Sequence, residues 1–204
     1  MRTIVSFLIL FLLSSAPATA QTAPGGGNGA CVGGEPGAPV RIEVFSDYQC
    51  PACRQFYLET MRPVLDNYAS AGKVCVVYRE LPLTMHAHAR EAAHYAHAAQ
   101  RLGMRYWRLV SDALYQSQSQ WSANGQLEPV VAGALSEEDM SRLRKWMEDP
   151  AVEAAILSDI ALARERNVTA TPTFFVTAQG KTEKVSGVVQ YSVLQRYLDH
   201  LLGQ

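Results

Sequence analysis

Two cysteines three positions apart, Cys50 and Cys53, have the types and spacing that most clearly permit chemistry. Pro51, which suits the first turn of a helix, stands directly after the first of them. If a helix begins there, unpaired backbone N–H groups and the helix dipole favour a thiolate at Cys50. Cys53 would lie one turn further on, within reach of a reversible disulfide. In that arrangement Cys50 is the exposed attacking sulfur and Cys53 the resolving one.

A C-x-x-C pair by itself also fits a structural disulfide or half of a zinc site. The two other cysteines, Cys31 and Cys75, are single and far apart, so they do not supply a second pair of zinc ligands. Four histidines crowd one short window: His86, His88, His94 and His97. No carboxylate or cysteine spacing completes a metal shell with them, so we interpret them as surface or loop histidines and expect no metal site.

The elements that would position the pair begin with a strand over residues 40–45 and a helix over residues 51–70. Pro63 is expected to kink or interrupt this helix, and Gly72 to close it. A second strand follows over residues 73–81. Because a helix joins the two strands, we expect them to be parallel.

A long stretch, residues 87–167, has no strand signal and contains several helical segments. Helices are expected to start at Ser136, which forms a capping box with Asp139, and at Asp149, which precedes a proline. A strand hairpin and a closing amphipathic helix follow within residues 168–204. This order of elements predicts an α/β protein with an all-helical insertion.

The first residues read as an export signal. Arg2, an apolar run over residues 4–13 and a small-residue ending at Ala20 predict a secretory signal peptide over residues 1–20. Residues 21–39, rich in glycine and proline, predict a flexible lead-in. We therefore expect a soluble mature protein in the periplasm or another extracytoplasmic space, where disulfides can persist.

The net charge and the motifs of the chain exclude some classes of partner and cofactor. Without Arg2 the chain keeps 17 basic residues against 19 acidic ones, a net charge of about −2 with no concentrated basic face. This excludes a nucleic acid as the expected partner. No glycine-rich phosphate-binding motif is present, so no organic cofactor is expected.

Three segments in combination, "FSDYQCPAC", "RELPLTMHAHAREAA" and "TATPTFFV", resemble the DsbA-like branch of the thioredoxin superfamily. The resemblance extends from about residue 38 to the end of the chain. It implies a thioredoxin-like fold with an inserted all-helical domain. Residues 40–86 and 168–204 would form the thioredoxin-like domain, and residues 87–167 the insertion.

The same resemblance implies the site residues. Cys50 and Cys53 would be catalytic, with Pro51 and Ala52 between them. Thr171-Pro172 would carry a cis-proline loop that faces Cys50 and presents a backbone edge to an extended substrate.

Two departures from the family pattern bear on the chemistry. The dipeptide Pro51-Ala52 lacks the histidine or aromatic residue of many members, so we predict a Cys50 pKa less depressed than in the strongest oxidants. Relatives commonly place a buried glutamate six residues before the first cysteine, where this chain has Val44. Glu43 is one place earlier and should point to the opposite face of the strand, so water or another group must exchange the proton of the resolving thiol.

Cys31 and Cys75 are candidates for a structural disulfide, because an N-terminal strand in thioredoxin-like sheets commonly lies beside the strand after the first helix. Closing a loop of 44 residues would stabilise the fold by roughly 4 kcal/mol. The alternative is a buried free thiol at Cys75 and a mobile one at Cys31.

Together these features predict an exported thiol:disulfide oxidoreductase that introduces disulfides into secreted proteins through Cys50 and Cys53. Its expected partners are unfolded or partly folded secreted proteins with free thiols. The resemblance also implies a quinone-linked membrane oxidoreductase that reoxidises it. We expect a monomer, because the lead-in leaves no room for a dimerisation domain. The alternatives are a disulfide reductase or isomerase, and a metal-binding or chaperone-like protein that uses the cysteines and histidines as ligands.

Overall fold

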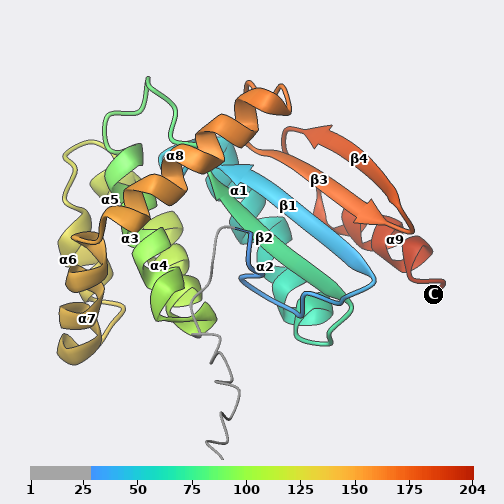
Figure 1. Ribbon diagram of the computed structural model, residues 1–204, viewed down its shortest axis with the longest axis horizontal. Helices are drawn as coiled ribbons and strands as arrows, with labels where there is room; N and C mark the ends of the chain where they lie inside the picture. Colours follow the sequence, from blue (N-terminus) through green and yellow to red (C-terminus); the bar gives the residue numbers. More distant parts are fainter. Residues whose placement is uncertain (1–28) are drawn as a thin grey trace, which may run out of the picture.

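A four-stranded sheet forms the centre of the computed structural model, which describes residues 29–204 (Figure 1). The strands are β1 Val40–Ser46, β2 Val74–Glu80, β3 Thr173–Ala178 and β4 Lys181–Ser186, in the spatial order β2-β1-β3-β4. β1 pairs with β2 in parallel, whereas β3 is antiparallel to both of its neighbours. The predicted α/β thioredoxin-like fold and the parallel first strand pair are confirmed. The predicted signal peptide lies outside the described residues.

The two faces of the sheet carry different side chains. The pairing of Val44 with Tyr78 and of Ser46 with Glu80 puts these four residues on one face, which we call the inner face. The first helix packs on this face, where the rings of Phe56 and Phe174 stack with their centroids 5.0 Å apart. The opposite face is covered by α8, Pro150–Glu165. The cysteine pair therefore belongs to the inner side of the sheet.

The first helix runs on through Pro63. It consists of α1 Pro51–Phe56, η1 Tyr57–Met61, α2 Arg62–Val64 and η2 Leu65–Ala69. The two η segments are π-helical, with wider turns such as the bond from Arg62 N–H to the Tyr57 carbonyl. A proline in a helix lacks an N–H and crowds the carbonyl four residues earlier, and a wider turn relieves both problems. Of the two outcomes expected at Pro63, a kink or an interruption, the interruption does not occur, because the helix changes its winding and continues; the kink stays a prediction.

Between β2 and β3 the described chain is helical. The helices are α3 Ala89–Leu102, α4 Met104–Gln116, α5 Gln118–Trp121, α6 Leu127–Ala132, α7 Glu137–Met147 and α8. Both predicted helix starts are confirmed, because Ser136 Oγ accepts from Asp139 N at 3.1 Å and Asp149 Oδ1 accepts from Ala151 N at 2.8 Å. The exact domain boundaries stay a prediction. In the described part of the chain, no helix is long and apolar enough to cross a membrane.

The described part of the lead-in is attached to the sheet. Cys31 and Cys75 form a disulfide, with Cα atoms 5.4 Å apart. An antiparallel bridge joins Gly33 to Val76, whose N–H donates to the Gly33 carbonyl at 2.9 Å. Within the predicted lead-in, a disulfide and a backbone bridge thus attach the segment that contains Cys31 and Gly33 to β2, and the flexibility of the lead-in stays a prediction.

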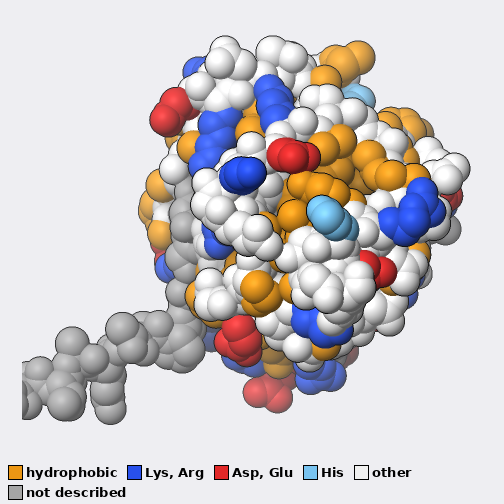
Figure 2. All heavy atoms as spheres, turned by 90° about the vertical axis from the view of Figure 1, so that its right-hand side faces the viewer, with side chains coloured by type: hydrophobic (Ala, Val, Ile, Leu, Met, Phe, Trp, Pro, Cys, Tyr) orange, Lys and Arg blue, Asp and Glu red, His pale blue; other side chains and the backbone are white. Residues whose placement is uncertain are grey.

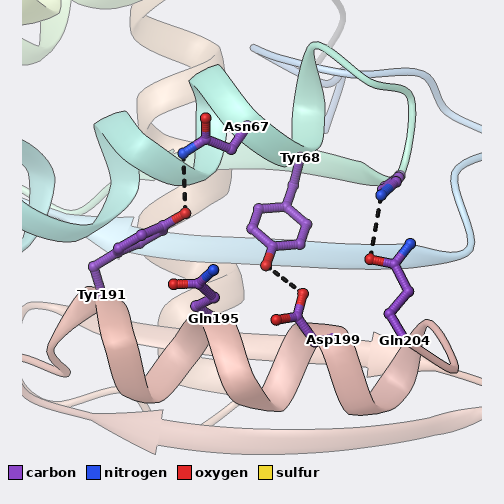
Figure 3. Close-up of a pocket in the computed structure, with 7 residues that line it drawn as sticks. Asn67, Tyr68, Tyr191, Gln195, Asp199 and Gln204 are labelled. Atoms are coloured by element: carbon purple, nitrogen blue, oxygen red, sulfur yellow. Dashed lines mark hydrogen bonds between the residues drawn. The ribbon is translucent and has the colours of Figure 1, made fainter.

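The last helix, α9 Tyr191–Leu201, is anchored to the end of the first helix (Figure 3). Tyr68 donates to Asp199 at 2.5 Å, and Asn67 donates to Tyr191 at 2.9 Å. These side chains point toward one another across an open polar pocket of about 590 Å³ (Figure 3). The contacts fix α9 against the same face of the sheet as the cysteine pair.

Candidate active site

Cys50 is the N-cap residue of α1, and Cys53 lies in the first turn. Both are free thiols in this structure. Cys50 is 8 % exposed and Cys53 1 %. The expectation of an exposed attacking sulfur therefore needs correction, because Cys50 is the more accessible of the two but is largely covered. Pro51 is exposed and Ala52 half-buried, so the dipeptide between the cysteines forms the rim of the site.

The surroundings of Cys50 favour its thiolate. A hydrogen bond from the Cys53 thiol lowers the pKa of Cys50 most, and burial opposes this effect. The backbone N–H groups of Cys53 and Ala52 add to the lowering, as a helix N-terminus does for an anion. A hydrogen bond with Thr171 also lowers the pKa of Cys50. The net result is a pKa of Cys50 of about 5, so that this sulfur is anionic at neutral pH.

The surroundings of Cys53 favour its neutral thiol. Burial raises the pKa of Cys53 well above its ordinary value, and the nearby Cys50 raises it further. A hydrogen bond with the Ser46 side chain works in the other direction. The backbone N–H of Asp47 also points to the Cys53 sulfur, at 3.5 Å. The two sulfurs therefore have opposite protonation preferences, as a nucleophile and a resolving thiol require.

A loop from far along the chain completes the site. The Thr171-Pro172 peptide bond is cis, and the Thr171 carbonyl oxygen lies 3.6 Å from Cys50 Sγ. Behind it, Thr173 Oγ1 donates to the Ala170 carbonyl at 2.7 Å, and Gly187 N–H donates to the Pro172 carbonyl at 2.8 Å. These bonds hold the loop directly against the cysteine pair.

Sequence analysis missed the residues that hold the turn before Cys50. The buried Asp47 carboxylate accepts from Gln49 N at 2.7 Å, and its other oxygen lies 2.8 Å from His86 Nδ1. From α5, Gln118 Nε2 donates to the Cys50 carbonyl at 3.0 Å. An aspartate three residues before a helix N-cap, able to accept from the backbone N–H two residues further on, is a local turn signal that could have pointed to Asp47. Nothing local to Gln118 indicates its contact.

His94, His97 and Glu43 make their contacts with other residues than the two cysteines. His94 Nε2 pairs with Glu153 at 2.7 Å, and burial lowers the pKa of His97 to about 4. Across residues 29–204, no group of three or more histidine, cysteine and acidic side chains could hold a metal ion. On the face of the sheet opposite the cysteines, Glu43 accepts from Arg79 at 2.6 Å. Glu43 therefore serves an ion pair there.

A cysteine pair at a helix start, facing a cis-proline loop on this sheet, defines a DsbA-like thiol:disulfide oxidoreductase fold with a disulfide-forming pair. The chain belongs to the thioredoxin family: residues 28–200 match the family model described as thioredoxin. α-DsbA1 of Wolbachia pipientis superposes with a TM-score of 0.70 at 22 % identity, over 83 % of this chain and 88 % of that one. DsbA2 of Pseudomonas aeruginosa superposes with a TM-score of 0.64 at 29 % identity, over 82 % and 91 %.

Two curated relatives differ in kind. The Na(+)/H(+) antiporter NhaA 3 of Salinispora tropica is 33 % identical over 146 residues, which are 70 % of this chain and 21 % of that protein. The probable disulfide bond formation protein D of Bacillus anthracis is 24 % identical over 152 residues, 70 % of this chain and 67 % of that protein. The chain thus spans about a fifth of the length of the antiporter relatives, at 21 %.

Proposed function

We propose that the protein is an exported thiol:disulfide oxidoreductase that introduces disulfides into secreted proteins through Cys50 and Cys53. The observation that carries the proposal is the placement of Cys50 at the N-cap of α1, against Cys53 and 3.6 Å from the Thr171 carbonyl oxygen of the cis-proline loop, which lowers the pKa of Cys50 to about 5. A thiol with a low pKa stabilises the reduced pair and is a good leaving group. Its disulfide is therefore readily given to a substrate, which favours oxidation over reduction.

The chemistry follows from the two sulfurs. A substrate thiolate attacks Cys50 Sγ in the oxidised pair, the bond to Cys53 breaks, and a mixed disulfide forms. A second substrate thiolate then attacks the substrate sulfur and releases Cys50 as a thiolate. The substrate is oxidised by two electrons and the pair is reduced by two. If Cys53 attacks Cys50 first, the mixed disulfide reverts and the substrate is released reduced.

A surface near the pair suits unfolded substrates. Hydrophobic side chains gather on the side of the molecule formed by β3, β4 and α9 (Figure 2). An apolar groove of about 280 Å³ on this side is lined by Phe174, Val176, Val185, Val189, Leu194 and Tyr197, with others. Phe174 is two residues beyond Pro172, so the groove starts close to the cis-proline loop. An extended chain paired to that loop could place apolar side chains in the groove.

The cellular setting is part of the proposal. Cleavage after Ala20 would release a soluble monomer into the periplasm or another extracytoplasmic space, where unfolded secreted proteins with free thiols are the substrates. A quinone-linked membrane oxidoreductase would reoxidise the pair. Intact-mass analysis of the exported protein is expected to show a chain that begins at Gln21, and a retained leader would contradict export by cleavage.

The rival functions make different predictions. A reductase would have a Cys50–Cys53 disulfide more stable than the disulfide of glutathione, whereas a disulfide donor would have a less stable one. Equilibration with glutathione therefore distinguishes the two. A metal-binding or chaperone-like protein would retain zinc or copper in stoichiometric amounts after purification, and we expect neither.

The direct test is the oxidation of a reduced model peptide by the oxidised protein. The Cys50→Ser variant is expected to show no turnover, because no disulfide can form at the site. A matched control replaces Cys31 and Cys75 with alanine, which removes the other disulfide and should leave turnover in place at a temperature where the variant is folded. Turnover retained by Cys50→Ser would contradict the mechanism.

A further inference from the structure

When the cysteine pair opens, Cys53 leaves as a sulfur anion in a place without water. Cys53 is 1 % exposed, and burial raises its pKa well above the ordinary value. A departing anion at such a position must receive a proton from a neighbouring buried group. Val44, the position at which relatives commonly carry an acid, cannot supply one.

Glu80 lies on the neighbouring strand at the same level of the site. It is the last residue of β2 and pairs with Ser46, the last residue of β1, so both side chains lie on the inner face of the sheet. Neighbouring strands are about 4.8 Å apart. The Ser46 side chain shares a hydrogen bond with Cys53, and its Oγ lies 2.8 Å from the Tyr115 hydroxyl. Ser46 is therefore the residue that is paired with Glu80 in the sheet and that also contacts the Cys53 sulfur.

The surroundings of Glu80 favour its neutral acid. Glu80 is 3 % exposed. Burial first, and then the carboxylates of Asp159 and Asp47, raise its pKa well above the ordinary value. Asp159, from α8, accepts from the Glu80 N–H at 3.0 Å.

The other ionisable groups around Glu80 do not supply a positive charge that would favour its carboxylate. The buried hydroxyls of Tyr48 and Tyr78 interact electrostatically with Glu80 and, because burial raises their pKa values, they remain neutral. Arg79 points to the other face of the sheet, where it pairs with Glu43 at 2.6 Å and Asp159 at 3.0 Å. His86 binds Asp47 and not Glu80. In the described chain no arginine or lysine forms an ion pair with the Glu80 carboxyl, in keeping with a neutral acid.

We propose that Glu80 is the buried acid that protonates Cys53, by way of the Ser46 hydroxyl, as the Cys50–Cys53 disulfide opens. A substrate thiolate bonds to Cys50 Sγ, the electron pair of the broken S–S bond stays on Cys53, and that sulfur takes the Ser46 proton while Glu80 replaces it. The products are the mixed disulfide, the Cys53 thiol and the Glu80 carboxylate. In the reverse step the carboxylate takes the proton back. This inference rests on the proposed exchange at Cys50 and Cys53.

The experiment compares the rate at which oxidised wild-type protein and the Glu80→Gln variant react with a reduced model peptide, over a range of pH. General acid catalysis typically contributes 10²–10⁴-fold, so we expect Glu80→Gln to be roughly a hundredfold slower at acidic and neutral pH. The ratio of wild-type to variant rate should fall as the pH rises through the pKa of Glu80, because the carboxylate cannot donate. Taking the ratio cancels the ionisation of the peptide thiol.

Two further variants separate this role from a structural one. Glu80→Asp keeps a carboxyl group and should retain the pH-dependent ratio at a reduced rate. Glu43→Gln, a buried glutamate on the other face of the sheet, should retain the wild-type profile. If Glu80→Gln does not fold, the Ser46→Ala variant is measured instead. The same loss of rate is expected, because the hydroxyl that would pass the proton from Glu80 to Cys53 is absent.

Wild-type rates and an unchanged pH profile in Glu80→Gln, or in Ser46→Ala where it replaces that variant, would overturn the proton-donor role. The function itself is tested separately. If wild-type protein oxidises the peptide and Cys50→Ser does not, the exchange stands, whatever the result at Glu80. If wild-type protein fails to oxidise the peptide at any pH, both the function and this role are refuted.

Discussion

Acidification is expected to destabilise the reduced protein through Cys50. In the folded state the Cys53 thiol and the backbone N–H groups at the start of α1 favour the Cys50 thiolate. They lower the pKa of Cys50 from 9.0 to about 5. A pKa that is lower in the folded than in the unfolded state adds stability at high pH, and this stability is lost as the pH falls through the folded value.

The size of the effect follows from these two pKa values. At pH 7 the folded thiol is almost fully ionised and the unfolded one almost fully protonated, which is worth about 3 kcal/mol of unfolding free energy. At pH 4 both are protonated, and the contribution is close to zero. Cys53 adds little over this range, because its raised pKa keeps it neutral in the folded state and the ordinary pKa of a thiol keeps it neutral in the unfolded state.

Urea unfolding of the reduced wild-type protein and of a reduced Cys50→Ala variant, at pH 7 and at pH 4, measures this contribution. The difference in unfolding free energy between the two proteins should change by about 3 kcal/mol between these pH values. Other groups titrate equally in both proteins and cancel. A change below about 1 kcal/mol would refute the reasoning, as would a thiolate absorbance at 240 nm with a midpoint above about 7. A midpoint below about 4 would instead contradict the expectation of a weaker oxidant than the most acidic family members.

Two further predictions concern stability. Replacing Cys31 and Cys75 with alanine should lower the unfolding free energy by roughly 4 kcal/mol, because the disulfide closes a loop with a sequence separation of 44. Urea unfolding measures this, and a loss below about 1 kcal/mol would show that the loop is constrained by other means. Asp159→Asn should cost about 3 kcal/mol in the same assay, since it leaves the buried Arg79 guanidinium with one partner fewer. Asp66→Asn, which breaks an exposed pair, is the matched control and should cost less than about 1 kcal/mol; equal losses would contradict the role of burial.

Local signals in the sequence predicted the structure correctly where it depends on interactions between residues that are close in the sequence. Pro51 after Cys50, the capping side chain of Ser136 and the aspartate-proline pair at Asp149 each specify a helix start through bonds within a few residues. The interruption that was one of two outcomes expected at Pro63 does not occur. A helix can continue past a proline by widening its turns, and tertiary packing of both flanking segments decides whether it does.

Contacts between segments that are distant in the sequence could not be predicted from residue patterns alone. The meeting of Thr171 with Cys50 was expected only from a family resemblance, and the hydrogen bond from Gln118 to the Cys50 carbonyl was not expected at all. The disulfide that joins Cys31 to Cys75 was expected, again with the help of the resemblance, but the backbone bridge from Gly33 to Val76 was not, because a glycine-rich segment has no pattern of its own.

The sequence by itself determined the reactive pair, its place at a helix start and the alternation of strands and helices, since each depends on residues a few positions apart. Only the tertiary structure decided how deeply the two sulfurs are buried and which acidic residue the sheet pairs with Ser46. Glu80 is 27 residues from Cys53 along the chain, and only the pairing of β2 with β1 sets it beside Ser46. Strand register is a property of the assembled sheet, and a shift of one residue would turn Glu80 to the opposite face.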